Sequence, residues 1–242
     1  MENYSKSEKC FNKKIVFDFG EVNMKKRWSV FFLGVFVFGF LILFSSNTRA
    51  DTRTNVEDNC EDADNLMVVA HPDDESLWGG SHLLKDKYFV VCVTCGSNEI
   101  RNREFKRAMN KSGSCYVSFN YPDLVDGIKE KWGNYYFSIE NDIKNIINQK
   151  KWKTIVTHNP DGEYGHIHHR MVSDIVTSIA DKQSLYYFDV YNYKASNECN
   201  DLCQSKLELL SVYKSQTAII NNHVNTIKYE NFISYYDWKD RT

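Results

Sequence analysis

The sequence lacks a basic stripe, internal repeats and low-complexity tracts. The first 50 of its 242 residues hold eight Lys or Arg and four Asp or Glu of the chain's 30 and 32, which leaves 22 against 28 and a net charge of −6 for residues 51–242. Nucleic-acid-binding domains concentrate positive charge on one face, so nucleic acid is not expected as a partner. Residues 51–242 have the length of one ordinary domain with a real core.

The sequence also lacks a second Cys-x-x-Cys pair to complete a tetrahedral zinc site with Cys92 and Cys95. Cys92 lies inside the apolar run 89–93, where a free cysteine behaves as a small core residue. Six cysteines come after residue 50, and an even number permits disulfides in an exported domain. Cys199 and Cys203 are close enough in the sequence to pair with each other.

One long uncharged run, residues 28–44, differs in character from the rest of the chain. Its 17 residues are long for a buried core helix and at the short end for a membrane span. Because Lys25-Lys26-Arg27 precedes the run, the positive-inside rule leaves the N-terminus in the cytoplasm and exports the chain beyond residue 44. We expect either an uncleaved signal anchor, which gives a single-pass membrane protein with the domain on the non-cytoplasmic side, or a signal peptide. The signal peptide would start at Met24 and be cleaved after Ala50, and the domain would then be secreted or periplasmic.

The predicted organisation has three parts. Residues 1–50 form a cytoplasmic segment with the anchor or signal peptide, residues 51–65 form a polar linker, and residues 66–242 form the main domain. In this domain short β-branched or aromatic runs alternate with helical patterns. Strands are predicted at 66–70, 88–94, 115–119, 154–158 and 185–191, and helices near 75–85, 99–112, 137–150, 167–181 and 202–217. The alternation predicts an α/β fold, a mostly parallel Rossmann-like sheet with helices on both faces, preceded by one N-terminal hydrophobic helix.

A histidine and three carboxylates, His71-Pro72-Asp73-Asp74-Glu75, come directly after the first predicted strand. Adjacent carboxylates repel one another unless a cation lies between them, and a metal ion is the simplest such cation. Capping of a helix N-terminus by the acidic residues is compatible with this pattern, but it does not account for His71. Two adjacent aspartates on a helical turn point about 100° apart, so one can bind metal while the other faces a bound water.

A second cluster, Gly165-His166-Ile167-His168-His169, comes after the fourth predicted strand. In a helix that begins there, His166 and His169 are neighbours on one face, whereas His168 lies ~200° around the helix from His166. We therefore predict His166 and His169 as the working pair and His168 as a surface residue. Open α/β sheets bind ligands at the carboxyl ends of their strands, which is where both clusters lie.

The two clusters together are typical of a hydrolytic metal site. Catalytic zinc is held by three protein ligands and keeps one position open for water, and two histidines with one carboxylate supply those ligands. The remaining aspartate is then a general base against a water whose pKa the metal has lowered.

These residues resemble the PIG-L family, also called LmbE-like, of zinc-dependent de-N-acetylases. The marks of the family are an Ala-His-Pro-Asp-Asp-Glu sequence after the first strand and a later His-x-x-His. The resemblance covers most of residues 66–217. It extends to five further segments: Thr157-His158-Asn159-Pro160, Gly162-Glu163-Tyr164-Gly165-His166, Arg101-x-x-Glu104, Tyr121-Pro122-Asp123 and Tyr213-x-Ser215-Gln216.

The resemblance implies a role for each of eight residues. The ligands of one Zn²⁺ per chain are His71, Asp74 and His169. The general base, the histidine that stabilises the oxyanion or protonates the leaving amine, and the tyrosine that helps at the carbonyl are Asp73, His166 and Tyr164. The substrate-binding positions are Arg101 and Asp123.

The sequence departs from the family pattern at three positions. His168 stands where the family often has Asp or Asn, Cys95 precedes Gly96 where Asp or Asn is common, and Ser112 replaces a usual Leu. The catalytic set is intact, so these departures bear on specificity rather than activity.

The expected function is removal of acetyl from an N-acetylglucosamine-type conjugate, and a membrane contact is expected only through the N-terminal helix. One alternative is an amidohydrolase for a non-sugar or glycolipid N-acyl substrate, including GlcNAc-phosphatidylinositol. A second alternative, from another class, is a catalytically idle cell-surface binding module, but such a module has no chemical need to keep Asp73 beside Asp74.

Overall fold

The computed structural model describes residues 53–54, 60–125, 128–129, 131–191, 201–223 and 230–241. The hydrophobic run 28–44, the cleavage position after Ala50 and Cys199 lie outside these residues, and so does the N-terminal helix expected there. Within the described ranges no helix is long and apolar enough to cross a membrane.

Seven strands form one sheet in the order β1-β4-β3-β2-β7-β8-β9. Their bounds are β1 Arg53–Thr54, β2 Asn65–Val69, β3 Tyr88–Thr94, β4 Cys115–Tyr121, β7 Thr154–Thr157, β8 Leu185–Phe188 and β9 Phe232–Ser234. The five inner strands pair in parallel, whereas β1 and β9 join the two edges antiparallel. The predicted α/β fold with a mostly parallel sheet is therefore confirmed.

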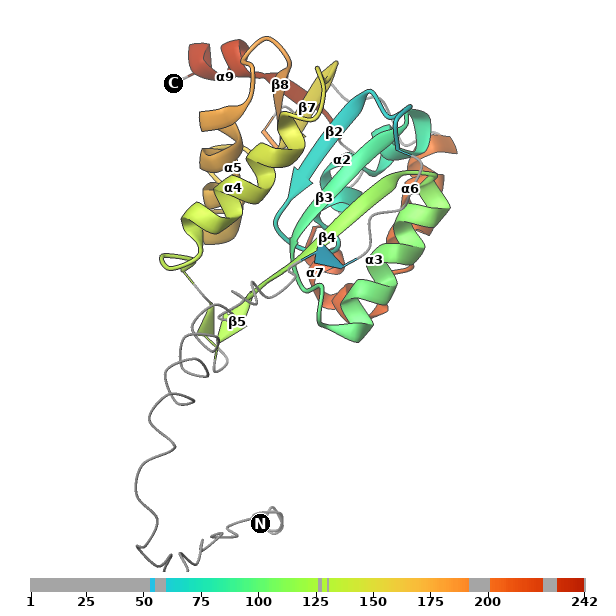
Figure 1. Ribbon diagram of the computed structural model, residues 1–242. Helices are drawn as coiled ribbons and strands as arrows, with labels where there is room; N and C mark the ends of the chain where they lie inside the picture. The colour runs from blue at the N-terminus through green and yellow to red at the C-terminus, as the bar shows by residue number, and fades with distance from the viewer. Residues whose placement is uncertain are drawn as a thin grey trace, which may run out of the picture. The chain divides into compact units, whose positions relative to one another are not determined.

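Helices cover both faces of the sheet (Figure 1). Side chains alternate along β2, so that Leu66 and Val68 enter one apolar cluster and Met67 and Val69 enter the other. The first cluster is completed by α4 (Tyr136–Ile147) and α5 (Ile167–Ile179), and the second by α2 (Asp74–Lys85), α3 (Glu99–Ser112) and α6 (Asp201–Leu210). Because both faces are covered, the inner strands are predominantly apolar.

The order of strands reverses at β2. From β2 the chain continues outward to β3 and β4 on one side, and later returns to β7 and β8 on the other. The register pairs Val68 with Thr157, so the residues that come after these strands, His71 and His158, leave the sheet at the same edge. Ligands of open α/β sheets bind at such a point of reversal.

The predicted linker contains ordered structure. Arg53 and Thr54 form β1 on the edge of β4, and Cys60 forms a disulfide with Cys115, the first residue of β4. Cys203 is disulfide-bonded as well, whereas Cys92 is a buried free thiol.

The predicted helix 202–217 is interrupted. α6 ends at Leu210, and after it come a 3-10 turn at Lys214–Gln216 and α7 at Thr217–Asn222. In the break the Tyr213 hydroxyl donates to Glu75 Oε1 and the Ser215 hydroxyl donates to Glu104, so these side chains attach the segment to α2 and α3. The hairpin of β5 (Leu124–Val125) and β6 (Ile128–Lys129), the strand β9 and the helix α9 (Tyr235–Arg241) were not predicted.

A buried ion pair fastens the C-terminal part of the chain to α2. Glu230 accepts from the backbone N–H groups of Ser81 and His82, both at 2.8 Å, and lies 2.7 Å from Lys206 Nζ. Lys206 is only 1 % exposed. Burial opposes ionisation of Glu230, but Lys206 and His82 outweigh it and lower the pKa of Glu230 to about 2 from 4.5.

We expect Glu230→Gln to lower the free energy of unfolding by about 3–5 kcal/mol at neutral pH, because it leaves a buried lysine without its counter-charge. The contribution of Glu230 is complete above about pH 4.5 and is lost as the pH falls toward 2, since the folded state holds the carboxylate ionised longer than the unfolded state does. Urea unfolding at several pH values measures both effects.

The control is the double variant Lys206→Met with Glu230→Gln, which leaves no buried charge and should regain much of the lost stability. A double variant no more stable than Glu230→Gln alone would show that the ion pair is not the origin of the effect.

Candidate active site

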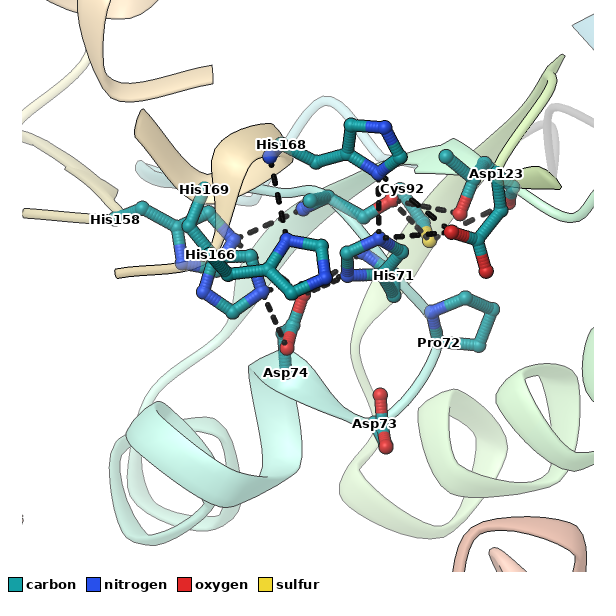
Figure 2. A network of polar contacts seen from close by, with 12 residues as sticks. His71, Pro72, Asp73, Asp74, Cys92, Asp123, His158, His166, His168 and His169 are labelled. Carbon is teal, nitrogen blue, oxygen red and sulfur yellow. Dashed lines mark hydrogen bonds and ion pairs between the residues drawn. The ribbon is translucent and has the colours of Figure 1, made fainter. Parts of the chain in front are cut away.

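The first motif turns sharply between β2 and α2. Asp73 has φ +121°, which is a rare conformation for a residue with a side chain. Its N–H donates to Glu75 Oε2 at 3.1 Å, and its carbonyl accepts from Leu77 N at 2.8 Å as α2 begins. The turn separates the two aspartates, and Figure 2 shows Asp74 pointing into a group of histidines while Asp73 lies apart from it.

The second motif enters α5 through a tight loop. Gly162 has φ +70°, its carbonyl accepts from His166 N at 3.1 Å, and a Cβ there would lie 2.7 Å from the carbonyl oxygen of His166. A residue with a side chain would therefore be strained and would collide with the loop. His166 is the N-cap of α5, and its Nδ1 accepts from the backbone N–H of His168 at 3.2 Å.

The three ligands implied by the family resemblance lie together and are buried. His71 Nδ1 is 3.2 Å from Asp74 Oδ2, His169 Nε2 is 3.3 Å from Asp74 Oδ1, and His169 Nε2 is 3.3 Å from His71 Nδ1. Ligand atoms 2.0–2.1 Å from a tetrahedral zinc are roughly 3.3 Å from one another. These nitrogen and oxygen atoms therefore fit a zinc ion in spacing and in chemistry.

Candidate ligands overlap around this triangle. In the described part of the chain three further groups of side chains offer ligand atoms close enough to share an ion: His71 with His166 and His169, His71 with Asp123 and His168, and Asp74 with His158 and His169. His71 or His169 belongs to every group, so the groups are variants of one site.

Glu163 and His158 orient the ligand His169. The backbone N–H of Ala70 donates to His158 Nε2 at 3.0 Å, so His158 carries its proton on Nδ1, which lies 2.9 Å from Glu163 Oε2. His169 Nδ1 lies 2.6 Å from the same oxygen and donates to it, which leaves Nε2 free for a metal. Burial opposes ionisation of Glu163, but His158 and His169 outweigh it and lower its pKa to about 2.

His168 is not a surface residue, and this prediction was wrong. It is fully buried, its Nδ1 lies 3.0 Å from His71 Nε2, and its ring stacks on Trp132 with centroids 4.1 Å apart and planes 1° apart. The helical spacing does not apply to His166, whose backbone is extended because α5 begins only at Ile167. The rings of His166 and His168 are in contact, with centroids 5.3 Å apart, and the loop that carries Trp132 covers the face assumed to be in solvent. His168 therefore supports the outer side of the ligand His71 (Figure 2).

The two aspartates have opposite electrostatic environments. Burial raises the pKa of Asp73 well above its usual value, and the neighbouring Asp74 adds to the effect. Burial also acts on Asp74, but His169 and His71 outweigh it and hold its pKa well below the usual value. Asp74 is therefore a permanent anion suited to a metal, and Asp73 is a carboxyl suited to exchange a proton.

Arg101 and Asp123 lie beside the first motif. Arg101 donates to the carbonyl of Pro72 at 2.9 Å, approaches Asp73 Oδ1 at 3.5 Å and donates to Asp123 Oδ2 at 3.2 Å. Both residues line a cavity of about 430 Å³ whose other polar walls include Asn98 and Asn120. Arg101 thus holds the loop of Asp73 and also borders a space for a polar ligand.

Tyr164 lies at the open side of the site. It is 53 % exposed, and its ring centroid is 5.4 Å from that of His169 and 5.9 Å from that of His166. On its other side is His223, with ring centroids 5.0 Å apart. His223 lies at the end of α7 and has no motif around it, so the sequence does not indicate its position near the site.

Lys129 reaches the site from the β5–β6 hairpin. Its Nζ lies 2.6 Å from Nε2 of His166, a residue that is 8 % exposed. The hairpin strands have two residues each, so no periodic pattern reveals them.

The sequence is similar to a known protein family and to individual known proteins. The family model described as PIG-L: GlcNAc-PI de-N-acetylase matches residues 66–180. An uncharacterized protein of Acanthamoeba polyphaga mimivirus is 31% identical over 193 residues, which is 71% of this chain and 80% of that protein. A probable N-acetylglucosaminyl-phosphatidylinositol de-N-acetylase of Schizosaccharomyces pombe is 30% identical over 121 residues, 43% of this chain and 46% of that protein.

Solved structures share the fold at low identity. A deacetylase from the biosynthesis pathway of teicoplanin, in complex with bog, matches with a TM-score of 0.51 and 15% identity over 65% of this chain and 86% of that one. The pseudoaglycone deacetylase of an antimicrobial reagent matches with a TM-score of 0.50 and 15% identity over 66% of this chain and 84% of that one. The solved structures share the fold, and the sequence match shows that the chain belongs to the PIG-L family.

We expect His169→Ala to abolish binding of zinc, because it removes a ligand. We expect Glu163→Gln to weaken binding by about 10–100-fold, because it removes the negative charge beside His169 and leaves one acceptor oxygen for the contacts with His158, His169 and the backbone of Asn159. Competition with a chromogenic chelator measures the affinity, and metal analysis of the purified variants measures the content.

The matched control is Glu208→Gln, the same change on an exposed carboxylate of α6, which should bind zinc as the wild type does. Zinc affinity that is equal in Glu163→Gln and Glu208→Gln would contradict the orienting role.

Proposed function

We propose that this chain is a zinc-dependent N-deacetylase that hydrolyses the acetamide of an N-acetylglucosamine-type conjugate. One observation carries the proposal: His71 Nδ1 and His169 Nε2 lie 3.3 Å apart, and each lies 3.2–3.3 Å from a carboxylate oxygen of Asp74. Beside them is the buried carboxyl group of Asp73, which is not part of this set. The second feature in its favour is the contrast between the raised pKa of Asp73 and the lowered pKa of Asp74.

His71, Asp74 and His169 would hold the metal. When bound, a zinc ion polarises the amide carbonyl and lowers the pKa of water. The surrounding residues set which ring nitrogen of each histidine ligand is deprotonated. Glu163 accepts from Nδ1 of His169, and His168 contacts Nε2 of His71, the nitrogen that faces away from the other ligands.

Proton transfer is assigned to Asp73. Its carboxylate takes the proton of the attacking water and, as the carboxylic acid, returns it to the amine nitrogen that leaves. Arg101 holds the loop of Asp73 through Pro72 and fixes the orientation of the base. We assign His166 to stabilising the oxygen of the amide carbonyl as it gains negative charge. Tyr164 is assigned to the same carbonyl, which it would contact from the exposed side of the site.

The amino-sugar class is supported by the family and by the polar cavity at Arg101 and Asp123. GlcNAc-phosphatidylinositol is a second candidate, favoured by the description of the family model and by the name of the fission-yeast relative. A non-sugar amide or an idle binding module would use the same fold, and turnover measurements separate these alternatives.

We also propose that the domain works in an oxidising compartment, exported either on the anchor or after cleavage behind residue 50. The Cys60–Cys115 disulfide and the disulfide-bonded Cys203 support the proposal, because disulfides persist mainly in exported proteins.

We expect the zinc-loaded protein to release acetate from GlcNAc conjugates, and to act poorly on unlinked GlcNAc because remote contacts that position the amide are missing. Asp73→Asn should retain its zinc and lose about 10²–10⁴-fold in kcat. Acetate release across N-acetyl sugars and non-sugar N-acyl amides is the measurement.

Asp86→Asn, the same change at an exposed position after α2, is the control and should keep full activity. Turnover of non-sugar amides alone would remove the sugar assignment. Loss of zinc in Asp73→Asn with retention in Asp74→Asn would reverse the roles of the two aspartates.

We expect a reporter that is active only in the cytoplasm to be silent when it is fused after Thr242, since the flank Lys25-Lys26-Arg27 favours export of the domain. A bright signal would overturn the proposed compartment and would strengthen the GlcNAc-phosphatidylinositol alternative.

A further inference from the structure

Lys129 is a cation that the β5–β6 hairpin brings to the catalytic histidine. Val125 pairs with Ile128 and Leu124 pairs with Lys129, so Lys129 lies opposite a residue that lines the cavity at Arg101. Its Nζ lies 2.6 Å from His166 Nε2. The sequence motifs give this lysine no role.

Both ring nitrogens of His166 face donors. The backbone N–H of His168 lies 3.2 Å from Nδ1, and Lys129 Nζ lies 2.6 Å from Nε2. A neutral imidazole carries one proton and accepts at one nitrogen only. The donors around His166 therefore exceed what its ring alone can accept.

Lys129 and His166 can donate to the same place. When the His168 N–H occupies Nδ1, the proton of His166 is on Nε2, beside the Lys129 ammonium, which only donates. An oxygen atom that bears negative charge then accepts from both groups. The pair is complementary to an anionic oxygen.

The place of this pair indicates which oxygen it serves. The ring of His166 is in contact with both histidines of the ligand set, with centroids 4.7 Å from His71 and 4.5 Å from His169. An oxygen bound at Nε2 is therefore adjacent to the atoms that would hold the metal, where the amide carbonyl must lie for hydrolysis.

We propose that Lys129 Nζ and His166 Nε2 together bind the oxyanion of the tetrahedral intermediate, which makes Lys129 a further catalytic residue. The inference rests on the proposed deacetylase function. As water attacks, a C–O bond forms, the proton of the water passes to Asp73, and the π electron pair of the carbonyl moves onto its oxygen. Lys129 and His166 donate to that oxygen. On collapse the C=O bond re-forms, the C–N bond breaks, and the amine takes the proton from Asp73.

The test replaces Lys129 by Met, which keeps most of the length of the unbranched side chain and removes its charge and donors. In the zinc-loaded full chain, kcat on a GlcNAc conjugate should fall about 10²–10³-fold, the usual effect of losing one oxyanion donor, with KM nearly unchanged. Lys129→Arg keeps a charged donor and should restore most of the lost kcat. Lys131→Met, the same change on an exposed neighbour, should keep the wild-type kcat.

A binding measurement accompanies the kinetics. The methylphosphonamidate of glucosamine has a tetrahedral anionic group, so its affinity, measured by calorimetry, should fall in Lys129→Met by the same factor as kcat/KM. Equal behaviour of the Met variants at 129 and 131 in both measurements would overturn the proposal. A raised KM with unchanged kcat would also overturn it, because Lys129 would then bind a remote anionic group of the substrate.

Failure of the proposed function is distinguishable from failure of this inference. If the wild type hydrolyses no N-acetyl conjugate, the deacetylase assignment falls, and the phosphonamidate affinities of the two Met variants still decide whether Lys129 binds an anionic oxygen. If the wild type is active and the variants do not differ, only the role of Lys129 falls.

Discussion

The parallel pairing of β2 with β7 is the constraint on which the site depends. These strands are adjacent in the sheet although about ninety residues separate them in the chain, and their register places both carboxyl ends at one edge. Each strand then delivers one half of the ligand set through a loop in an unusual backbone conformation, at Asp73 in one case and at Gly162 in the other. Neither half is a metal site by itself. A shift of one residue in this register would reverse the faces of the strand and separate the two halves.

The buried anionic groups of the site each lie beside a histidine or an arginine. Glu163 and Asp74 are buried anions, and both are bordered by the histidines His158 and His169. On the other side Arg101 lies between Asp73 and Asp123. Buried charges are tolerated only with such partners, and most of these groups are therefore fixed before any ligand arrives. Preorganisation of this kind reduces the rearrangement needed when charge develops during a reaction.

Much of the architecture was predictable from the sequence, because buried parallel strands are short apolar runs and the helices between them have clear boundaries. The proximity of His71, Asp74 and His169 was also predictable, since they lie in two dense motifs at strand ends. The prediction for His168 failed because α5 begins only after His166, whose backbone is extended, and because Trp132 from a distant loop packs on His168. Two other contacts of the site were not predicted from the sequence. Glu163 contacts His158 and His169, and Lys129 contacts His166, which is 37 residues away in the chain. Contacts of this kind depend on loop geometry, for which the sequence has no periodic signal.

The disulfide between Cys60 and Cys115 has a mechanical consequence. The bond joins the chain ahead of β2 to the start of β4, two strands away in the sheet. A force that enters along the backbone from residues before Cys60 would reach this covalent cross-link before it reaches the first residue of β2, Asn65. The load would then pass into β4 at the edge of the parallel strands, and the short strand β1 could detach without moving β2. Domains tethered through their N-terminal end are pulled along this route, and the strand that presents His71 would bear little of the strain.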